Sequence, residues 1–470
     1  MKRIIRNIFY FTSIVIISTC LSSCNEFLGI MPAGSKIPTT LSDFEALLRD
    51  EYTCQRADIT QAVVLLNDKF ETASNLNYYK LRDINYNWKE GENRIPHNTD
   101  EGTYYNTYAA ISTYNLILQS AQNMTECTEK ERNVLIAQAR LLRAHCYFLL
   151  ANYYAETYDK ATAETKLSVP LITSADMGAA YKQVTIADLY SFILEDINAA
   201  ITNLPERAQT AIHPNLGAGY ALLARVYLQM EEYNLALEAA DKALNQNNRL
   251  YDWVKYYNDN KFQIDNPISY VSTTSPMGYD YVENYYFRHG NSSYSSSENS
   301  ITIDRANLYE NNDLKFKARW KLKTVGADTY YVSTLRGVFN HGGLTTTEVY
   351  LIRAECLARA GKLSEAMADI NAIRITRILP DKYIPLSAST TEQAIKYIKQ
   401  IKNNELIFSI TPFADTRRLN KDPKYLTTLT KQVNGETRIL APNSYLYTMP
   451  FPVGAIENTG NGSLVQNVAQ

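Results

Sequence analysis

Side chains that build metal centres and redox sites are scarce in this sequence. Its 470 residues include 5 histidines and 6 cysteines. The histidines are scattered, and no two cysteines form a C-x-x-C pair, so the chain has neither a zinc-ribbon nor a thioredoxin-type motif. These absences argue against a metal enzyme, and we expect no metal ion and no cofactor.

An excess of positive charge is also missing. The chain carries 47 lysines and arginines against 49 aspartates and glutamates, a formal net charge of −2. Because a nucleic-acid-binding protein needs a clustered basic footprint, we expect no nucleic acid partner. The same balance gives the chain no polybasic route to a membrane surface, so a membrane anchor has to come from another feature.

Long apolar runs are missing too, apart from one near the start. Ile8–Ile17 is almost wholly apolar and follows a short cationic segment, but a spanning helix needs roughly 20 such residues. A run of this length is typical of an export signal, and Leu21–Cys24 looks like the site at which lipoproteins are processed. We predict a signal peptide over residues 1–23, lipid on Cys24 and an extended tether over residues 24–40. The alternative is an ordinary secretory signal with a chance cysteine.

Four cysteines remain after this segment. Cys146 and Cys356 lie in apolar helical patterns and are expected to be buried thiols. Cys54 and Cys127 could pair in an oxidising compartment or could stay free, and their spacing does not decide between the two.

Tyrosine is the residue type in clear excess. The chain has 36 tyrosines against 14 phenylalanines and 3 tryptophans. A tyrosine ring offers a flat apolar face with a polar tip, which suits hydrated recognition surfaces. Part of this excess packs between helices, so composition only favours a binding function.

Apolar residues at steps of three and four predict helices over much of the chain. The clearest segments are 41–48, 104–122, 129–158 and 185–203. In the first of them, Ser42 precedes Glu45 at the spacing of a capping box, which predicts an N-cap at Ser42.

Two segments, 220–243 and 350–370, are more specific. Each places large, small and aromatic residues at the intervals of a tetratricopeptide helical pair, with small residues where the two helices cross. Gly361 stands at the turn of the second pair. The two segments are not in tandem, because a region of different composition separates them.

That region, residues 251–344, is rich in Asn, Ser, Gly and Tyr and has short β-like pieces. We therefore predict a mainly α fold of tetratricopeptide-like helical pairs with a loop-rich variable region and a few short strands. Within one domain over 41–470, the helical repeats occupy about 41–250 and 345–420, and a loop-rich tail follows.

Several motifs together resemble one family, the SusD/RagB-like outer-membrane lipoproteins of Bacteroidetes. The segments that carry the resemblance are Cys24–Leu28 (CNEFL), Ala137–Ala144 (AQARLLRA), Ala221–Leu228 (ALLARVYL) and Tyr350–Arg359 (YLIRAECLAR). Two further family hallmarks are degraded here, at Lys402–Phe408 and around Met449–Pro452. The chain is therefore identified as a divergent member.

The resemblance implies the SusD-like fold and a function. Members sit on a SusC-like TonB-dependent outer-membrane transporter, to which they pass captured oligosaccharides. We accordingly expect a lipid-anchored outer-membrane protein, facing the cell surface, that binds an oligosaccharide and is not an enzyme. The alternatives are a peptide-binding member of the same family and, from another class, a glycoside hydrolase lipoprotein.

Candidate ligand-binding residues are aromatic side chains in polar surroundings, because sugars present apolar C–H faces between hydroxyl groups. Structural packing is the competing interpretation at each position. It is the favoured one for Trp320 and for the tyrosines of the variable region. The candidates are Tyr86, Asn87 and Trp88 in a polar connection, Tyr279, Tyr281, Tyr285 and Tyr294 in the variable region, and Trp320 on an expected strand.

Overall fold

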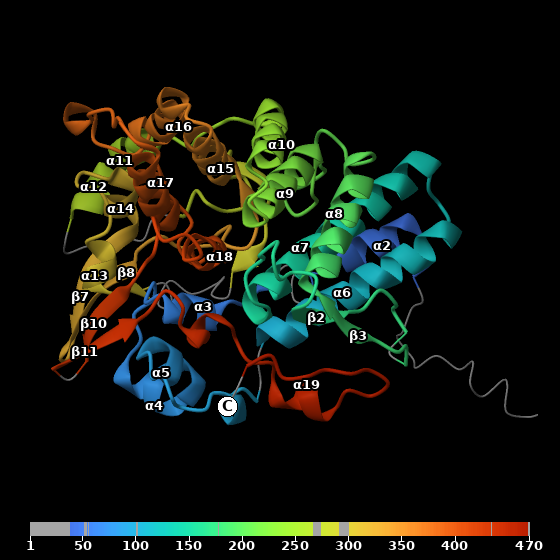
Figure 1. The fold of residues 1–470 in the computed structure, drawn as a ribbon. Helices are drawn as coiled ribbons and strands as arrows, with labels where there is room; N and C mark the ends of the chain where they lie inside the picture. Colours follow the sequence, from blue (N-terminus) through green and yellow to red (C-terminus); the bar gives the residue numbers. More distant parts are fainter. Residues whose placement is uncertain are drawn as a thin grey trace, which may run out of the picture.

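The computed structural model describes residues 38–50, 54, 56–99, 102–176, 178–266, 274–290, 300–433 and 435–468 (Figure 1). The predicted signal peptide, Cys24, most of the predicted tether and Tyr294 lie outside these residues.

Helices dominate the described chain, and the mainly α prediction is confirmed. The helices are α2 (Leu41–Leu48), α3 (Thr60–Leu65), α4 (Ala73–Tyr78), α5 (Lys80–Tyr86), α6 (Gly102–Ser120), α7 (Glu129–Tyr154), α8 (Ile186–Ile201), α9 (Leu216–Gln229), α10 (Tyr233–Gln246), α11 (Trp253–Asp259), α12 (Lys261–Asp265), α13 (Ile303–Ala306), α14 (Leu314–Arg319), α15 (Thr346–Arg359), α16 (Leu363–Ile375), α17 (Thr391–Glu405), α18 (Thr411–Leu419) and α19 (Val453–Glu457).

The strands are short and form small separate sheets. They are β1 (Arg56–Ala57), β2 (Leu167–Leu171), β3 (Lys182–Thr185), β4 (Asn284–Tyr286), β5 (His289–Gly290), β6 (Ser300–Ile301), β7 (Trp320–Val325), β8 (Asp328–Ser333), β9 (Leu344–Thr345), β10 (Leu429–Val433) and β11 (Glu436–Leu440). The pairs are β1–β5, β2–β3, β4–β9 and β10–β11, and β6–β8–β7 is a three-stranded sheet. The hairpin β10–β11 lies in the tail, where we expected loops.

Three helical pairs form the frame of the molecule. The pairs α7–α8, α9–α10 and α15–α16 succeed one another across it, with α8 against α9 and α10 against α15 (Figure 1). Fully buried alanines, such as Ala224 and Ala240, lie between the second pair, and their small side chains let the helix backbones approach closely. The predicted tetratricopeptide-like pairing is confirmed.

The cap of the first described helix lies two residues earlier than predicted. Thr40, not Ser42, is the N-cap of α2, and its side chain accepts a hydrogen bond from the backbone N–H of Asp43. Asp43 Oδ2 in turn accepts from the Thr40 backbone N–H at 3.1 Å. The capping box is therefore present but shifted, because Asp43 fills the role that we assigned to Glu45.

Among the helices of the described residues, α7 alone has the length and apolar composition to cross a membrane. Of its most apolar stretch, 83% is buried inside the protein. We therefore interpret α7 as the central core helix, covered by α6 and α8.

The described cysteines are all free. Cys54 is buried and its Sγ donates to the Leu47 carbonyl, while Cys127 Sγ lies against the Met124 carbonyl. Cys54 and Cys127 therefore do not form the pair that spacing had left open. Burial raises the pKa of Cys54 to about 12, so this thiol stays protonated and unreactive at neutral pH.

The turn between α15 and α16 depends on one glycine, and substitution of that glycine tests the described conformation. Gly361 has φ +78°, and nothing lies within 4 Å of the place that a β-carbon would take there. We expect Gly361→Ala to lower the free energy of unfolding by about 1 kcal/mol through backbone strain, as measured by urea denaturation. Gly361→Asn should cost less, because asparagine tolerates this conformation. Equal stability of all three proteins would contradict this account.

Candidate ligand-binding surface

The Tyr86–Trp88 segment does not form the exposed platform that we predicted. Trp88 is only 4% exposed, and its Nε1 donates to the Leu65 carbonyl at 2.7 Å. Lys431, on β10, covers the segment with its Nζ 3.9 Å from the Tyr86 ring centroid and 4.8 Å from that of Trp88. Asn87 is also engaged, since its Nδ2 donates to Asp83 Oδ1 at 2.7 Å. Packing, the competing interpretation, accounts for all three residues.

Three candidates of the variable region are also buried. Tyr285 packs against α9, where a Cβ at Gly217 would lie 2.6 Å from its ring, and its hydroxyl donates to the Ala243 carbonyl at 2.9 Å. Tyr281 belongs to a small core beneath α11 and α14, and Trp320 lies 3% exposed at the start of β7. Their rings are therefore not available for stacking in this conformation.

Tyr279 alone among the described candidates keeps a sizeable exposed area, at 38%. Its ring centroid lies 4.5 Å from that of Phe287, and its hydroxyl is 3.1 Å from His289 Nε2. Tyr279 stays a candidate, although both contacts hold it against the protein.

The most exposed aromatic pair lies elsewhere, at the end of α4. Tyr78 is 80% exposed and Tyr79 is 48% exposed, with ring centroids 4.7 Å apart and ring planes at 77°. The helix α4 has no buried residue, so these rings contribute nothing to the core. Leaving two large rings in water is unfavourable unless they have a further role.

A buried carboxylate fixes the polar groups beside this pair. Glu71 is almost fully buried, and its oxygens accept from Arg82 Nη1 at 3.3 Å and from Asn75 Nδ2 at 3.1 Å. The Arg82 guanidinium lies 4.5 Å from the Tyr79 ring centroid. We call Asn75, Tyr78, Tyr79 and Arg82 the α4 surface. It combines two ring faces with ordered hydrogen-bond donors.

The same segment is joined to the variable region. Phe70 stacks on Tyr330 of β8 with ring centroids 4.3 Å apart, and its backbone N–H donates to the Ser300 carbonyl at 2.9 Å. Below the hairpin β10–β11, α4 and α5 lie at the edge of the molecule (Figure 1). Burial raises the pKa of Tyr86 to about 12 and lowers that of Lys431 to about 7. These contacts hold the base of the α4 surface rigid.

The described residues place no group of three or more His, Cys, Asp and Glu side chains where it could hold a metal ion. Acidic side chains are instead engaged with cations: the buried Asp369 pairs with Arg353, and the partly exposed Glu310 pairs with Arg374. The α4 surface is therefore suited to binding through stacking and hydrogen bonds.

A family profile described as SusD-like, starch-binding and associating with the outer membrane matches residues 26–228. A SusD superfamily protein from Bacteroides thetaiotaomicron has 18% sequence identity and a TM-score of 0.67, over 92% of this chain and 100% of that one. The chain therefore has the SusD-like fold, and its residues 26–228 match the SusD-like family profile. A SusD superfamily protein from Bacteroides fragilis is 21% identical, with a TM-score of 0.65, over 90% of this chain and 99% of that one.

A third solved structure similar to this chain is surface glycan-binding protein A from Bacteroides uniformis. The identity is 16% and the TM-score 0.66, over 91% of this chain and 99% of that one. No curated protein matches the chain. The region matched by the family profile includes α4 and α5 and ends in α9, so the α4 surface lies inside it and the variable region lies outside.

The segment Lys402–Phe408, which we interpreted as a degraded family hallmark, has a structural role in this chain. Lys402 Nζ lies 2.5 Å from Asp415 Oδ2, and Asn404 Oδ1 accepts from Arg305 Nη1 at 2.7 Å. Sequence reasoning missed Tyr78 and Tyr79, although a signal was present. Adjacent aromatic residues at the end of a short helix without an apolar stripe cannot both face the core.

The contrast between Trp88 and Tyr78 can be tested by stability. Trp88→Ala should lower the free energy of unfolding by about 3–5 kcal/mol, because it removes a packed ring from the core. Tyr78→Ala should change it by less than about 0.5 kcal/mol, because the residue is exposed. Chemical denaturation of both variants measures the difference. A Trp88→Ala protein as stable as the wild type would show that the ring is not packed as described.

Proposed function

We propose that this protein is a surface lipoprotein that captures an oligosaccharide on the α4 surface and passes it to a TonB-dependent outer-membrane transporter. The observation that carries the proposal is the exposed pair Tyr78–Tyr79, on a helix that has no role in the core. The family description as starch-binding supports a saccharide as the ligand.

The geometry suits sugar rings. A pyranose presents apolar C–H faces between hydroxyls, so a tyrosine ring can cover one face while neighbouring donors bind the hydroxyls. The two ring planes, at 77° to each other, can contact two sugar units that are turned relative to one another. Arg82 and Asn75 are held in position as donors because both donate hydrogen bonds to Glu71.

The transporter is proposed from the family and from the N-terminal sequence. Cys24, with lipid attached, would hold the protein at the outer membrane on the cell-surface side, next to a SusC-like partner. Recovery of a TonB-dependent transporter with this chain from detergent extracts of the native membrane tests that partnership. We infer that the ligand is bound unchanged rather than cleaved.

Loss of either ring should weaken binding. We expect Tyr78→Ala and Tyr79→Ala each to raise the Kd for a bound oligosaccharide about 10-fold, equivalent to ~1.4 kcal/mol, without a change in Tm. Isothermal titration against a panel of starch-derived and other oligosaccharides measures this. Phe262→Ala is the matched control, since Phe262 is 76% exposed on α12 and should leave Kd unchanged.

The same titration separates the alternatives. Heat release with a peptide mixture but with no glycan would favour the peptide-binding function and contradict our proposal. Release of new reducing ends from a glycan would indicate a hydrolase. Wild-type affinity in both tyrosine variants would remove the α4 surface from the site.

Lipid attachment has its own test. Cys24→Ala should abolish incorporation of labelled palmitate in the native host, because the acyl chains are attached at that residue. Cys20→Ala is the control, since Cys20 lies within the predicted signal peptide, and it should keep the label. A labelled Cys24→Ala protein would contradict the predicted anchor.

A further inference from the structure

A second pocket lies far along the chain from the α4 surface, between α17 and the segment 424–427. Its volume is about 480 Å³, which falls within the ~300–1,000 Å³ typical of small-ligand sites. The lining side chains that matter are Lys396, Lys399, Lys424, Tyr425, Leu426 and Thr427. Three cations and an aromatic ring thus face one cavity.

The positive charge of this pocket is poorly compensated. Lys424 Nζ lies 3.3 Å from Glu392 Oε1, which also lines the pocket. Within the described part of the chain, neither Lys396 nor Lys399 has a carboxylate oxygen within 4.0 Å, and Lys399 Nζ donates to Thr427 Oγ1. The pocket therefore has two more cations than its single lining acid neutralises.

The acids behind Lys399 are already engaged. Glu355 of α15 accepts from Arg418 at 2.8 Å through both oxygens, and Asp415 of α18 lies 2.5 Å from Lys402 Nζ. Their charges act on Lys399 only from a distance, and Arg418 opposes them. Burial is the largest influence and lowers the pKa of Lys399 to about 8. Burying an ammonium group without a counter-ion costs free energy, and a bound anion would offset that cost.

The wall opposite α17 is rigid. The backbone N–H of Thr427 donates to Asn420 Oδ1 at 2.9 Å, and that of Tyr425 donates to the Asp422 carbonyl at 2.9 Å. The guanidinium of Arg359 lies 5.1 Å from the Tyr425 ring centroid and fixes the ring. A ligand therefore meets a preformed wall, which reduces the entropy lost on binding.

We propose that this pocket binds an acidic sugar, with its carboxylate on Lys399 and Lys396 and the C–H face of its ring on Tyr425. The exposed side chain of Leu426 extends the apolar wall. Gln393 also lines the pocket, and its Nε2 donates to Tyr397 Oη at 3.3 Å. The proposal rests on the proposed function only for the choice of a saccharide, since none of these residues belongs to the α4 surface. The pocket gives the protein a second, charge-selective contact with its ligand.

Titration with digalacturonic acid and with neutral galactobiose tests the proposal on the full chain. We expect digalacturonic acid to bind at least about 10-fold more tightly, because only it brings the missing negative charge. Lys399→Met and Lys396→Met should each weaken digalacturonic acid binding by a similar factor. Lys362→Met removes an exposed cation outside the pocket and should leave binding unchanged.

A pH series on the wild type needs no variant. Affinity for digalacturonic acid should fall as pH rises from about 7 to about 9.5, because Lys399, whose pKa burial lowers to about 8, loses its proton in that range. The other charged groups around Lys399 are Glu392, Glu355, Asp415 and Arg418. Hydrogen bonds lower the pKa of Glu392, and ion pairing outweighs burial to lower the pKa of Glu355 and raise that of Arg418, away from this pH range.

The two proposals fail separately. Tyr79→Ala should not affect digalacturonic acid binding in the pocket, and Lys399→Met should not affect a neutral oligosaccharide on the α4 surface. Equal affinity for the acidic and neutral disaccharides, wild-type binding by Lys399→Met, or no binding of digalacturonic acid would each overturn the pocket proposal. Binding of inorganic sulfate alone would also overturn it, because the sugar face would then have no role.

Discussion

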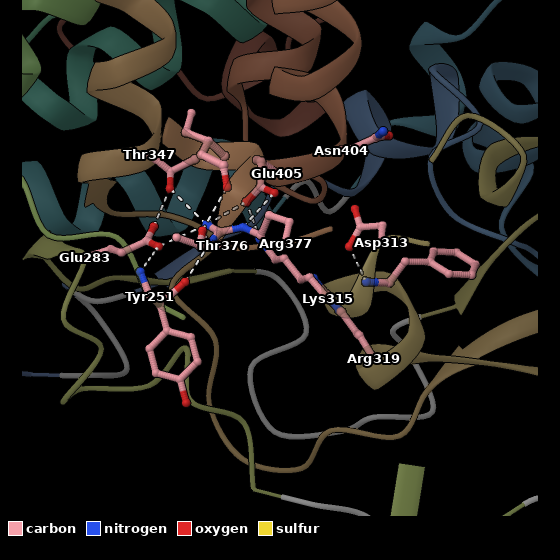
Figure 2. A network of polar contacts seen from close by, with 12 residues as sticks. Tyr251, Glu283, Asp313, Lys315, Arg319, Thr347, Thr376, Arg377, Asn404 and Glu405 are labelled. Atoms are coloured by element: carbon pink, nitrogen blue, oxygen red, sulfur yellow. Dashed lines mark hydrogen bonds and ion pairs between the residues drawn. The ribbon is translucent and has the colours of Figure 1, made fainter. Parts of the chain in front are cut away.

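A buried guanidinium joins the variable region to the helical frame. Arg377, after α16, is 2% exposed and donates to Glu283 Oε1 at 3.0 Å, to Glu405 Oε1 at 3.1 Å and to the Tyr251 carbonyl at 2.7 Å (Figure 2). Glu405 also lies 2.6 Å from Lys315 Nζ. Burial raises the pKa of Glu405, but the two cations outweigh it and hold that pKa at about 2. Removing one partner of such a pair leaves a buried charge and costs about 3–5 kcal/mol, so α16, α17 and the variable region keep one arrangement.

Buried arginine–carboxylate pairs also join the helices of the frame to one another. Arg225 of α9 binds Glu348 of α15 at 2.7 and 2.6 Å. Arg143 of α7 binds Asp196 of α8 in the same bidentate way, and Arg418 of α18 binds Glu355 of α15. Small residues let helices approach but leave their rotation and translation loosely defined, whereas a bidentate pair has one geometry. Arg143 and Arg225, which lie in two of the segments that carry the family resemblance, therefore stabilise the fold rather than bind a ligand.

Periodicity predicted the frame because each long helix has a continuous apolar face. It was less accurate where side-chain hydrogen bonds to the backbone determine the end of a helix. At the start of α2, Thr40 and Asp43 form the capping box that we expected from Ser42 and Glu45. The hairpin β10–β11 was missed although an Asn-Gly pair at residues 434–435 is a hairpin signal. The buried ion pairs could not be predicted at all, since partners such as Arg377 and Glu283 are 94 residues apart.

The candidate site was harder to predict than the fold because residue type does not reveal which faces of a ring are covered. Trp88 looked like a platform in its polar segment, but β10 arrives from more than 300 residues away and places Lys431 over it. Tyr78 and Tyr79 stay exposed because α4 is held by its cap and by the hydrogen bonds of Glu71 rather than by core packing. A surface built in this way can change its aromatic residues at little cost to the frame. The protein thus separates a core fixed by buried ion pairs from the α4 surface, whose side chains can be substituted without disturbing that core.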